Sequence, residues 1–324
     1  MAATLSGGRR DGGRRRAGRR AARSDDDAGG SEGHQELAIP RPAELLQRHG
    51  IHARKGLGQH FLVDRAHLAR IVNAAELKPD DVVLEVGPGL GVLTEALSDR
   101  AGHVIAVEID EAMRAVLHER LASRANLRIV AADVLETDPA ELVAGALGAR
   151  APQRGRVAGY KVVANLPYYI TSAVLRHVLE ARLRPERCVV MVQREVAERM
   201  MAGPGQMSIL AVATQLYAHP SRVAIVPGGA FYPRPKVDSA VVRLDVHPNL
   251  AVDVADVDAF FEVVRAGFGQ KRKQLRNSLA SGLDLPPPTI VTALEAAGVS
   301  PKRRAQTLAL AEWAAVARSL ADVR

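Results

Sequence analysis

The chain has 324 residues, a net charge of +8 and 47% hydrophobic residues, which suits a soluble protein with a large core. No apolar run reaches the roughly 18 residues that a membrane span needs, so we expect no membrane segment. The single cysteine, Cys188, excludes an internal disulfide, and the sequence shows no Cys/His cluster; we therefore predict a reducing compartment, no metal site and a core position for this thiol.

Residues 1–40 have the composition of a disordered, Gly/Arg-rich tail. The first half is rich in arginine, the second half is acidic, and large apolar side chains are almost absent. Such a segment cannot bury enough surface to fold. An organelle transit peptide is the alternative, although the arginines show no amphipathic period, and the apolar region of a secretory signal is missing. We therefore expect a cytoplasmic protein.

Residues 41–250 alternate between apolar runs and helical patterns, after a short helix that begins near Ala43. Near-continuous Val/Ile/Leu runs that alternate with helices are typical of a parallel sheet covered on both faces. Two later runs, 221–226 and 239–246, lack an intervening helix and predict an antiparallel hairpin at the sheet edge. The fold class is therefore α/β, a Rossmann-like, mostly parallel, doubly wound sheet. The expected parallel strands cover residues 81–87, 103–110, 127–133, 160–165 and 187–193.

From residue 251 to residue 324 the pattern changes to helices alone. We expect helices over 258–268, 271–281, 288–298 and 304–320. This change predicts a small all-helical C-terminal domain, with a boundary near residues 247–255. No internal repeat is visible.

The stretch "LEVGPGLGVLTEAL" lies at the first strand–helix turn. Gly87, Gly89 and Gly91 let backbone N–H groups approach a ligand. A dinucleotide site favours G-x-G-x-x-G, and here the third glycine comes one position early. The spacing is that of the E-x-G-x-G-x-G turn of S-adenosylmethionine (SAM) dependent methyltransferases, with Glu85 in first place.

Two acids end the second and third expected strands. In doubly wound sheets an acid at the position of Glu108 binds two ribose hydroxyls. A carboxylate at Asp133 is placed to accept a hydrogen bond from an adenine amine. Together with the glycine turn, these acids predict a SAM site; a tight turn with solvated acids is the alternative.

The stretch "VVANLPYYIT" begins as a strand and ends in a loop at the same rim. If the methyl acceptor is the exocyclic amine of a base, the Asn165 side-chain oxygen and the Leu166 carbonyl can accept its N–H bonds. This would favour a pyramidal nitrogen with its lone pair aimed at the methyl group. Pro167 restricts the local backbone, and Tyr168 is placed to stack on the base.

A second aromatic loop, "AFYPRPKVDSAVVRL", supports this interpretation. The chain has five Phe and five Tyr, and these two loops hold four of them. We predict that Phe231 closes the second face of the base, while Tyr169 and Tyr232 pack in the core or against loops.

At this point a family resemblance is evident. From about residue 43 to the C-terminus the chain resembles the ribosomal RNA adenine dimethyltransferases, and within them the small-subunit branch. The motifs that carry the resemblance are "GLGQHFL", "EVGPGLGVLTEAL", "VEID", "ANLPYYIT", "VMVQREVAERM", "FYPRPKVDSAVVRL" and "FGQKRKQLRNSL".

The resemblance implies four methyl transfers to N6 of two adjacent adenines, in a hairpin loop near the 3′ end of 16S rRNA in the 30S subunit. It implies SAM contacts at Leu62, Gly87, Glu108, Asp133 and Asn165. The family pattern has Asn where this chain has His60, so a cofactor contact at this position uses a ring nitrogen or the backbone; a solvated loop histidine is the alternative. We expect a monomer.

Two basic clusters lie in the expected helical domain. Arg272 and Arg276 are spaced i, i+4, which predicts one helical face. Beside an adenine site, such clusters favour contact with RNA phosphates, whereas alone they are equally consistent with a solvated helix face. The predicted RNA-binding residues are Lys271, Arg272, Lys273, Arg276, Lys302, Arg303 and Arg304.

Three other functions stay open from sequence alone. The first is methylation of an adenine in 23S rRNA, as in macrolide resistance. The second is a ribosome-assembly factor that keeps the fold with little catalysis, which the intact Asn165, Tyr168, Glu108 and Asp133 disfavour. The third is a SAM enzyme acting on DNA or protein amines, which the Phe231 loop and the basic C-terminal region make less favourable.

Overall fold

The computed structural model describes residues 41–53, 58–147 and 159–322. The predicted tail and residues 54–57, which include the first two residues of the GLGQHFL motif, lie outside these described residues. The described residues all belong to one compact unit. Within them, no helix is long and apolar enough to cross a membrane.

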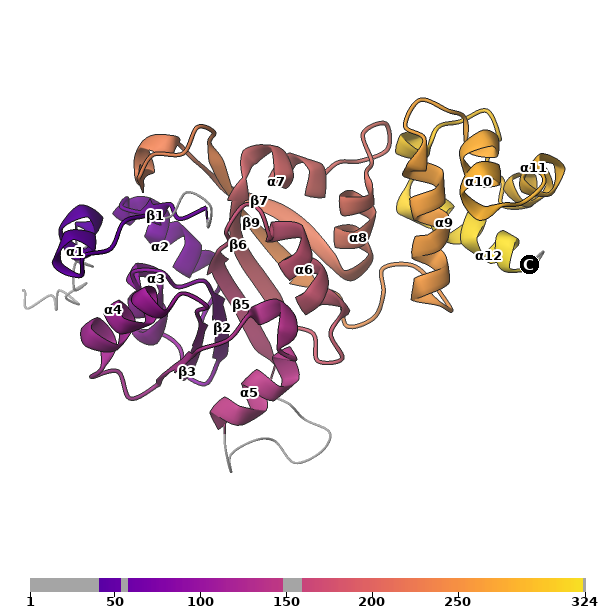
Figure 1. The fold of residues 1–324 in the computed structure, drawn as a ribbon. Coiled ribbons are helices and arrows are strands. Elements are labelled where there is room, and N and C mark those ends of the chain that lie inside the picture. The colour runs from indigo at the N-terminus through magenta and orange to yellow at the C-terminus, as the bar shows by residue number, and fades with distance from the viewer. Residues whose placement is uncertain (1–40, 54–57, 148–158, 323–324) are drawn as a thin grey trace, which may run out of the picture. The chain divides into compact units, whose positions relative to one another are not determined.

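A seven-stranded sheet forms the centre of the described chain (Figure 1), in the order β4-β3-β2-β5-β6-β9-β7. The strands from β4 to β6 are parallel, and β9 runs antiparallel to both β6 and β7. The sheet strands are β2 (Val82–Val86), β3 (His103–Val107), β4 (Leu127–Val130), β5 (Tyr160–Asn165), β6 (Arg187–Gln193), β7 (Ala218–Val226) and β9 (Ser239–Val246). The α/β prediction and the edge hairpin are therefore confirmed.

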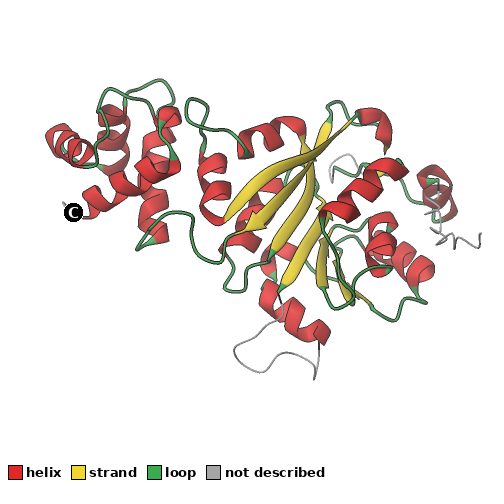
Figure 2. Cartoon of the chain, turned by 180° about the vertical axis from the view of Figure 1, so that it is seen from behind, coloured by secondary structure: helices red, strands yellow, loops and turns green. Residues whose placement is uncertain are grey.

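Helices cover both faces of this sheet, as the opposite views of Figures 1 and 2 show. Alternate strand residues enter two different hydrophobic cores: Val82 and Leu84 lie in one, and Val83 lies in the other. Such two-sided burial explains the continuous apolar runs of the sequence. The helices are α1 (Pro42–Arg48), α2 (Arg65–Ala74), α3 (Val92–Ser98), α4 (Glu111–Leu121), α5 (Pro139–Leu147), α6 (Thr171–Glu180), α7 (Arg194–Met200) and α8 (Ile209–Tyr217).

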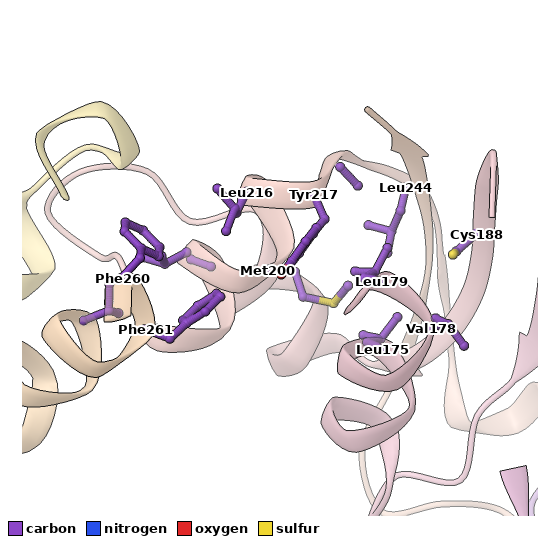
Figure 3. Packing of buried hydrophobic residues seen from close by; sticks show 14 of the residues in the cluster. Leu175, Val178, Leu179, Cys188, Met200, Leu216, Tyr217, Leu244, Phe260 and Phe261 are labelled. Carbon is purple, nitrogen blue, oxygen red and sulfur yellow. The ribbon is translucent and has the colours of Figure 1, made fainter. Parts of the chain in front are cut away.

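The segment after β9 is helical, as predicted, and it shares a core with α8. Phe260 and Phe261 belong to the same hydrophobic cluster as Leu216 and Tyr217, and Figure 3 shows these side chains near one another. The four helices are α9 (Val257–Gly269), α10 (Leu275–Leu283), α11 (Pro287–Ala296) and α12 (Leu310–Ala321).

A short antiparallel pair joins two distant segments. β1 (Phe61–Leu62) pairs with β8 (Phe231–Tyr232), so that Phe61 lies opposite Tyr232 and Leu62 lies opposite Phe231. In Figure 1 the segment after β7 accordingly lies beside β1. This pair brings the motif around His60 next to the second aromatic loop.

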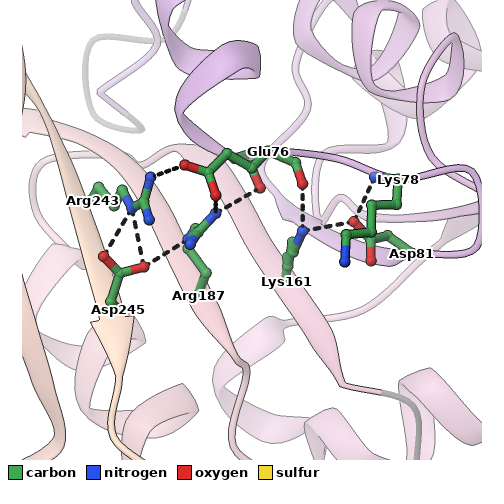
Figure 4. Close-up of polar contacts among 8 residues, drawn as sticks. Glu76, Lys78, Asp81, Lys161, Arg187, Arg243 and Asp245 are labelled. Carbon is green, nitrogen blue, oxygen red and sulfur yellow. Dashed lines mark hydrogen bonds and ion pairs between the residues drawn. The ribbon is translucent and has the colours of Figure 1, made fainter.

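The opposite, amino end of the sheet carries a network of ion pairs (Figure 4). Glu76 follows α2 and pairs with Arg187 of β6 and Arg243 of β9, which also bind Asp245. The Arg243 and Arg187 hydrogen bonds outweigh burial and hold the pKa of Asp245 below its usual value. The charges therefore tie the α2–β2 connection to the antiparallel half of the sheet.

Candidate active site

A cavity lies at the carboxyl ends of β2 and β5, where the strand order of the sheet reverses. Open α/β sheets bind ligands at this point because the loops after the two strands diverge. The cavity is lined by residues of the loops after β2, β3 and β5 and by the segment around β1, among them Gln59, His60, Leu62, Glu85, Gly87, Pro88, Gly89, Glu108, Ile109, Asn165, Leu166, Tyr168 and Tyr169.

The glycine turn after β2 has a backbone that only glycine adopts readily. Gly87, Gly89 and Gly91 have φ values of +66°, +56° and +77°. A β-carbon at Gly91 would also lie 2.7 Å from the Leu117 side chain of α4. The glycines therefore give the turn its shape and let α3 begin close to α4.

Glu85 is a buried acid in the wall of the cavity. It is 1% exposed, and its Oε2 atom has no hydrogen-bond partner among the described residues. Burial, with a smaller contribution from the charge of Glu108, raises the pKa of Glu85 to about 8. At neutral pH this carboxyl is therefore largely protonated, and a bound cationic group would favour its ionised form.

Glu108 follows the last residue of β3 and is held by two backbone N–H groups. Gly89 donates to Oε2 at 3.1 Å and Asp110 donates to Oε1 at 2.9 Å. Burial is the largest effect and raises the pKa of Glu108. The carboxylate thus links the glycine turn to the end of the neighbouring strand, and its contact with ribose hydroxyls stays a prediction.

Asn165 is the last residue of β5, and its amide is oriented by one contact. Nδ2 donates a hydrogen bond of 3.0 Å to the backbone carbonyl of His60. Because the amide nitrogen is used in this way, Oδ1 is the group of Asn165 that remains available as an acceptor. Leu166 follows with its side chain buried, and its N–H donates to Met191 of β6.

Tyr168 and His60 form a stacked pair in the cavity wall. Their ring centroids are 5.8 Å apart and their planes differ by 28°. The Tyr168 hydroxyl and Ser239 Oγ are hydrogen-bonded at 2.7 Å, while His60 Nδ1 is 2.7 Å from the carbonyl of Pro233 and donates to it. His60 is therefore a positioned residue rather than a solvated loop histidine, and its contacts join three motifs.

In the second aromatic loop the buried ring is Phe231, which was predicted to contact the base, and the exposed ring is Tyr232, which was predicted to be packed. Phe231 is 4% exposed and packs in the core with Leu62, outside the residues that line the cavity. Tyr169 and Tyr232, expected to be packed, are 60% and 43% exposed. A two-residue strand sends Phe231 inward and Tyr232 outward. A stacking role for Phe231 stays a prediction, and it would require the ring to become exposed.

Asp133 also lies away from its expected position. β4 ends at Val130, three residues earlier than predicted, and Asp133 caps a short 3-10 helix (Val134–Glu136) by accepting from the Leu135 N–H. It lies outside the residues that line the cavity. Its contact with an adenine amine stays a prediction.

The basic residues of the C-terminal segment fall into two groups. Leu275 N–H donates to the Arg303 carbonyl, and Arg276 N–H donates to the Pro301 carbonyl, so the two clusters lie side by side. Arg303 is bound by both oxygens of Glu312, which makes it a structural residue. The helix expected from residue 271 begins only at Leu275, so Arg272 and Arg276 share no helical face. The exposed members are Lys271, Arg272, Lys273, Arg276, Lys302 and Arg304.

The cavity is also lined by polar and exposed residues to which the sequence analysis gave no ligand contact. Gln59, Glu85, Ile109 and Tyr169 all line it, and Gln59 donates to the Asp110 carboxylate at 3.3 Å. Glu85 and Ile109 were detectable as neighbours of predicted site residues. The exposure of Tyr169 depends on tertiary packing, which a short motif does not reveal.

The residues of the cavity fit SAM. The glycine turn and Glu108 line one cavity at the switch point of the sheet, so that they could contact the ribose and the adjoining chain of such a cofactor, and Glu85 adds a polar oxygen to the wall that is unpaired among the described residues. The fold and this cavity define a SAM-dependent methyltransferase. A sequence profile of the family described as ribosomal RNA adenine dimethylase matches residues 50–322. The chain belongs to this family.

Individual relatives agree with this membership. A ribosomal RNA small subunit methyltransferase A of Dehalococcoides mccartyi is 50% identical over 271 residues, which cover 83% of this chain and 89% of the relative. The protein with the same name from Moorella thermoacetica is 48% identical over 287 residues, covering 88% and 98%.

Solved structures show the same fold. The 23S rRNA methyltransferase ErmE is 32% identical, with a TM-score of 0.61, and covers 81% of this chain and 99% of its own. A dimethyladenosine transferase from Plasmodium falciparum is 24% identical, with a TM-score of 0.63 over 79% of this chain and 96% of its own, and supports the fold alone.

Proposed function

We propose that this protein transfers methyl groups from SAM to N6 of two adjacent adenines in the 3′-terminal hairpin loop of 16S rRNA. Relatives that are 48–50% identical are named small-subunit methyltransferases, whereas the 23S enzyme is 32% identical. The difference favours the small subunit over the large one. The proposed setting is the 30S subunit or an assembly intermediate, in the cytoplasm, with the protein acting as a monomer.

The observation that carries the chemistry is the orientation of Asn165. Its Nδ2 is held by the His60 carbonyl, which leaves Oδ1 as an acceptor at the rim of the cofactor cavity. Among the described residues, no backbone N–H donates to the Leu166 carbonyl. Two acceptors on consecutive residues suit a group with two N–H bonds, which is what the adenine N6 amine presents.

These acceptors would act by orienting the amine. The N6 lone pair is delocalised into the ring and is a weak nucleophile. Hydrogen bonds from N6 to Asn165 Oδ1 and to the Leu166 carbonyl favour a pyramidal nitrogen whose lone pair is directed at the cofactor. When bound, SAM supplies an electrophilic methyl group. No strong base is needed, because the amine becomes more acidic as its bond to carbon forms.

Tyr168 is the proposed platform for the target base. One side of its ring is backed by His60, and its hydroxyl is fixed by Ser239. A ring held at both points can receive a flipped base with little further ordering.

The C-terminal segment, residues 251–324, is the proposed RNA-binding domain. Its support is the adjacency of residues 271–276 and 301–304, which gathers exposed cations on one surface. Several phosphate contacts there would give a steep dependence of binding on salt concentration.

The test is methyl transfer from labelled SAM to under-methylated 30S subunits, with 50S subunits as the matched alternative substrate. Modified nucleosides are then mapped by mass spectrometry. We expect N6,N6-dimethyladenosine at two adjacent positions near the 3′ end of 16S rRNA and none in 23S rRNA. Transfer to 23S rRNA, or tight binding to 30S subunits without transfer, would contradict the proposal.

A further inference from the structure

The loop between β8 and β9 lies at the edge of the acceptor site. Its first residue, Pro233, accepts a hydrogen bond from His60, and Ser239, at the start of β9, bonds the Tyr168 hydroxyl. Both partners line the cofactor cavity. Residues 234–238 are therefore anchored at both ends to the wall of the site where the target base would enter.

The anchoring continues on the side away from the cavity. The Asp238 carboxylate accepts from the Gly228 N–H at 3.1 Å, and the Asp238 carbonyl accepts from the Arg194 N–H at 3.0 Å. Tyr232, just before the loop, is paired in the sheet with Phe61. A loop held at four points loses little conformational entropy when a partner binds it.

The side chains of this segment that face solvent include an aromatic ring and two cations, together with Val237 and the Asp238 carboxylate, which accepts from the Gly228 N–H. Tyr232, Arg234 and Lys236 are exposed. Neither Arg234 nor Lys236 forms an ion pair with a described residue, in contrast to Arg194 nearby, which is neutralised by Glu198. Two unneutralised cations and an exposed ring on a rigid loop are the elements that bind a single-stranded nucleic acid, by phosphate contact and base stacking.

We propose that Tyr232, Arg234 and Lys236 form a second RNA-binding surface, which holds the nucleotides that flank the target adenine. The inference rests on the proposed function, since it takes the acceptor to be RNA. Its location beside Tyr168 distinguishes it from the cations of the C-terminal segment: it fixes the register of the substrate strand at the site, while those cations add affinity. Loss of this surface should therefore weaken the binding of the RNA substrate and leave the binding of the cofactor unchanged.

The experiment compares Arg234→Ala, Lys236→Ala and the double variant with the wild-type protein. Lys78→Ala is the matched control, because Lys78 is an exposed cation in the α2–β2 connection at the opposite end of the sheet. Binding to 30S subunits is measured over a range of salt concentrations, together with KM for 30S subunits and the affinity for S-adenosylhomocysteine by calorimetry.

We expect each single variant to reduce the slope of log K against log salt by about 0.7. The double variant should raise KM for 30S subunits by about tenfold or more, with an unchanged affinity for S-adenosylhomocysteine. Equal slopes and KM values for the double variant and Lys78→Ala would overturn the inference. If the wild-type protein itself transfers no methyl groups to 30S subunits, the proposed function fails, and the binding slopes still decide the role of this loop.

Discussion

Glu85 combines deep burial with an oxygen, Oε2, that has no hydrogen-bond partner among the described residues. Its pKa is near 8 in the folded protein and near 4.5 in an unfolded chain. Between these values the folded state keeps a proton that the unfolded state releases, so the free energy of unfolding falls as pH rises, by up to about 1.4 kcal/mol per pH unit. An ionised Glu85 would thus be disfavoured until a ligand compensates for its burial.

The corresponding prediction concerns Glu85→Gln in the absence of cofactor. The neutral amide removes this titration, so the stability of the variant relative to wild type should increase as pH rises from 4.5 toward 8. Urea unfolding at several pH values across this window measures it. Parallel curves for the two proteins would show that Glu85 is already ionised in the folded state.

Two substitutions at Tyr168 separate the contribution of its ring from that of its hydroxyl. Tyr168→Phe keeps the ring and loses the bond to Ser239, which is worth about 0.5–1.5 kcal/mol. Tyr168→Ala also removes base stacking, worth about 1–3 kcal/mol. We expect methyl transfer to 30S subunits to fall by about tenfold or less in the Phe variant and considerably further in the Ala variant. Equal losses in both would contradict stacking on this ring.

Among the secondary-structure elements, the amino end of β5 carries the most buried ion pair of the Figure 4 network. Lys161 Nζ lies 2.7 Å from Asp81, with side chains 8% and 12% exposed, and it also donates to the Glu76 carbonyl. The pair fastens β5, which ends in Asn165, to the connection that precedes β2. Its removal should therefore act on stability and leave the chemistry of the site intact.

Lys161→Met leaves the Asp81 carboxylate buried without its partner and should lower the free energy of unfolding by about 3–5 kcal/mol. The double variant Lys161→Met/Asp81→Asn should recover part of this loss. Arg176→Ala breaks an exposed helical pair with Glu180 and serves as control, with an expected change of about 0.5 kcal/mol or less. Denaturant unfolding measures all three, and a single variant as stable as the control would contradict a structural role for the pair.

Before α12, the neighbouring residues Arg303 and Arg304 have different roles. Arg303 binds Glu312 and the Thr307 carbonyl, and this arginine holds the pKa of Glu312 below its usual value. Arg304 is exposed. Arg303→Ala should lower the melting temperature with little change in the salt dependence of 30S binding, and Arg304→Ala should do the reverse. A thermal melt and a salt titration of 30S binding for each variant test this. If Arg303→Ala reduced the dependence of binding on salt concentration, Arg303 would contact RNA after all.

For the whole molecule, the parts predicted best are those with a local sequence signal. The apolar runs predicted every parallel strand of the sheet, and the motifs after β2 and β5 predicted two of the loops that line the cavity. α2, α5 and α8 were not anticipated. The segment that forms α8, "ILAVATQLY", is too short and too apolar for periodicity to distinguish a buried helix from a strand.

Pairing between distant segments accounts for the other features of the structure that the sequence did not predict. The insertion of β9 between β6 and β7, and the pairing of β1 with β8, depend on contacts between distant segments. The β1–β8 pair determines which of Phe231 and Tyr232 is buried, and it brings Pro233 to His60. No local pattern specifies these contacts, so the burial of the second aromatic loop and the role of His60 became visible only in the structure.

The central claim is that Asn165 orients the acceptor amine. The most direct measurement is the single-turnover rate of methyl transfer to under-methylated 30S subunits at saturating SAM, for wild type and Asn165→Ala. We predict a loss of about 10²–10³-fold, comparable to removing one hydrogen-bonding group from a preorganised site, with unchanged binding to 30S subunits. A rate within a few fold of wild type would contradict the account, because the amine would then react without the Asn165 oxygen.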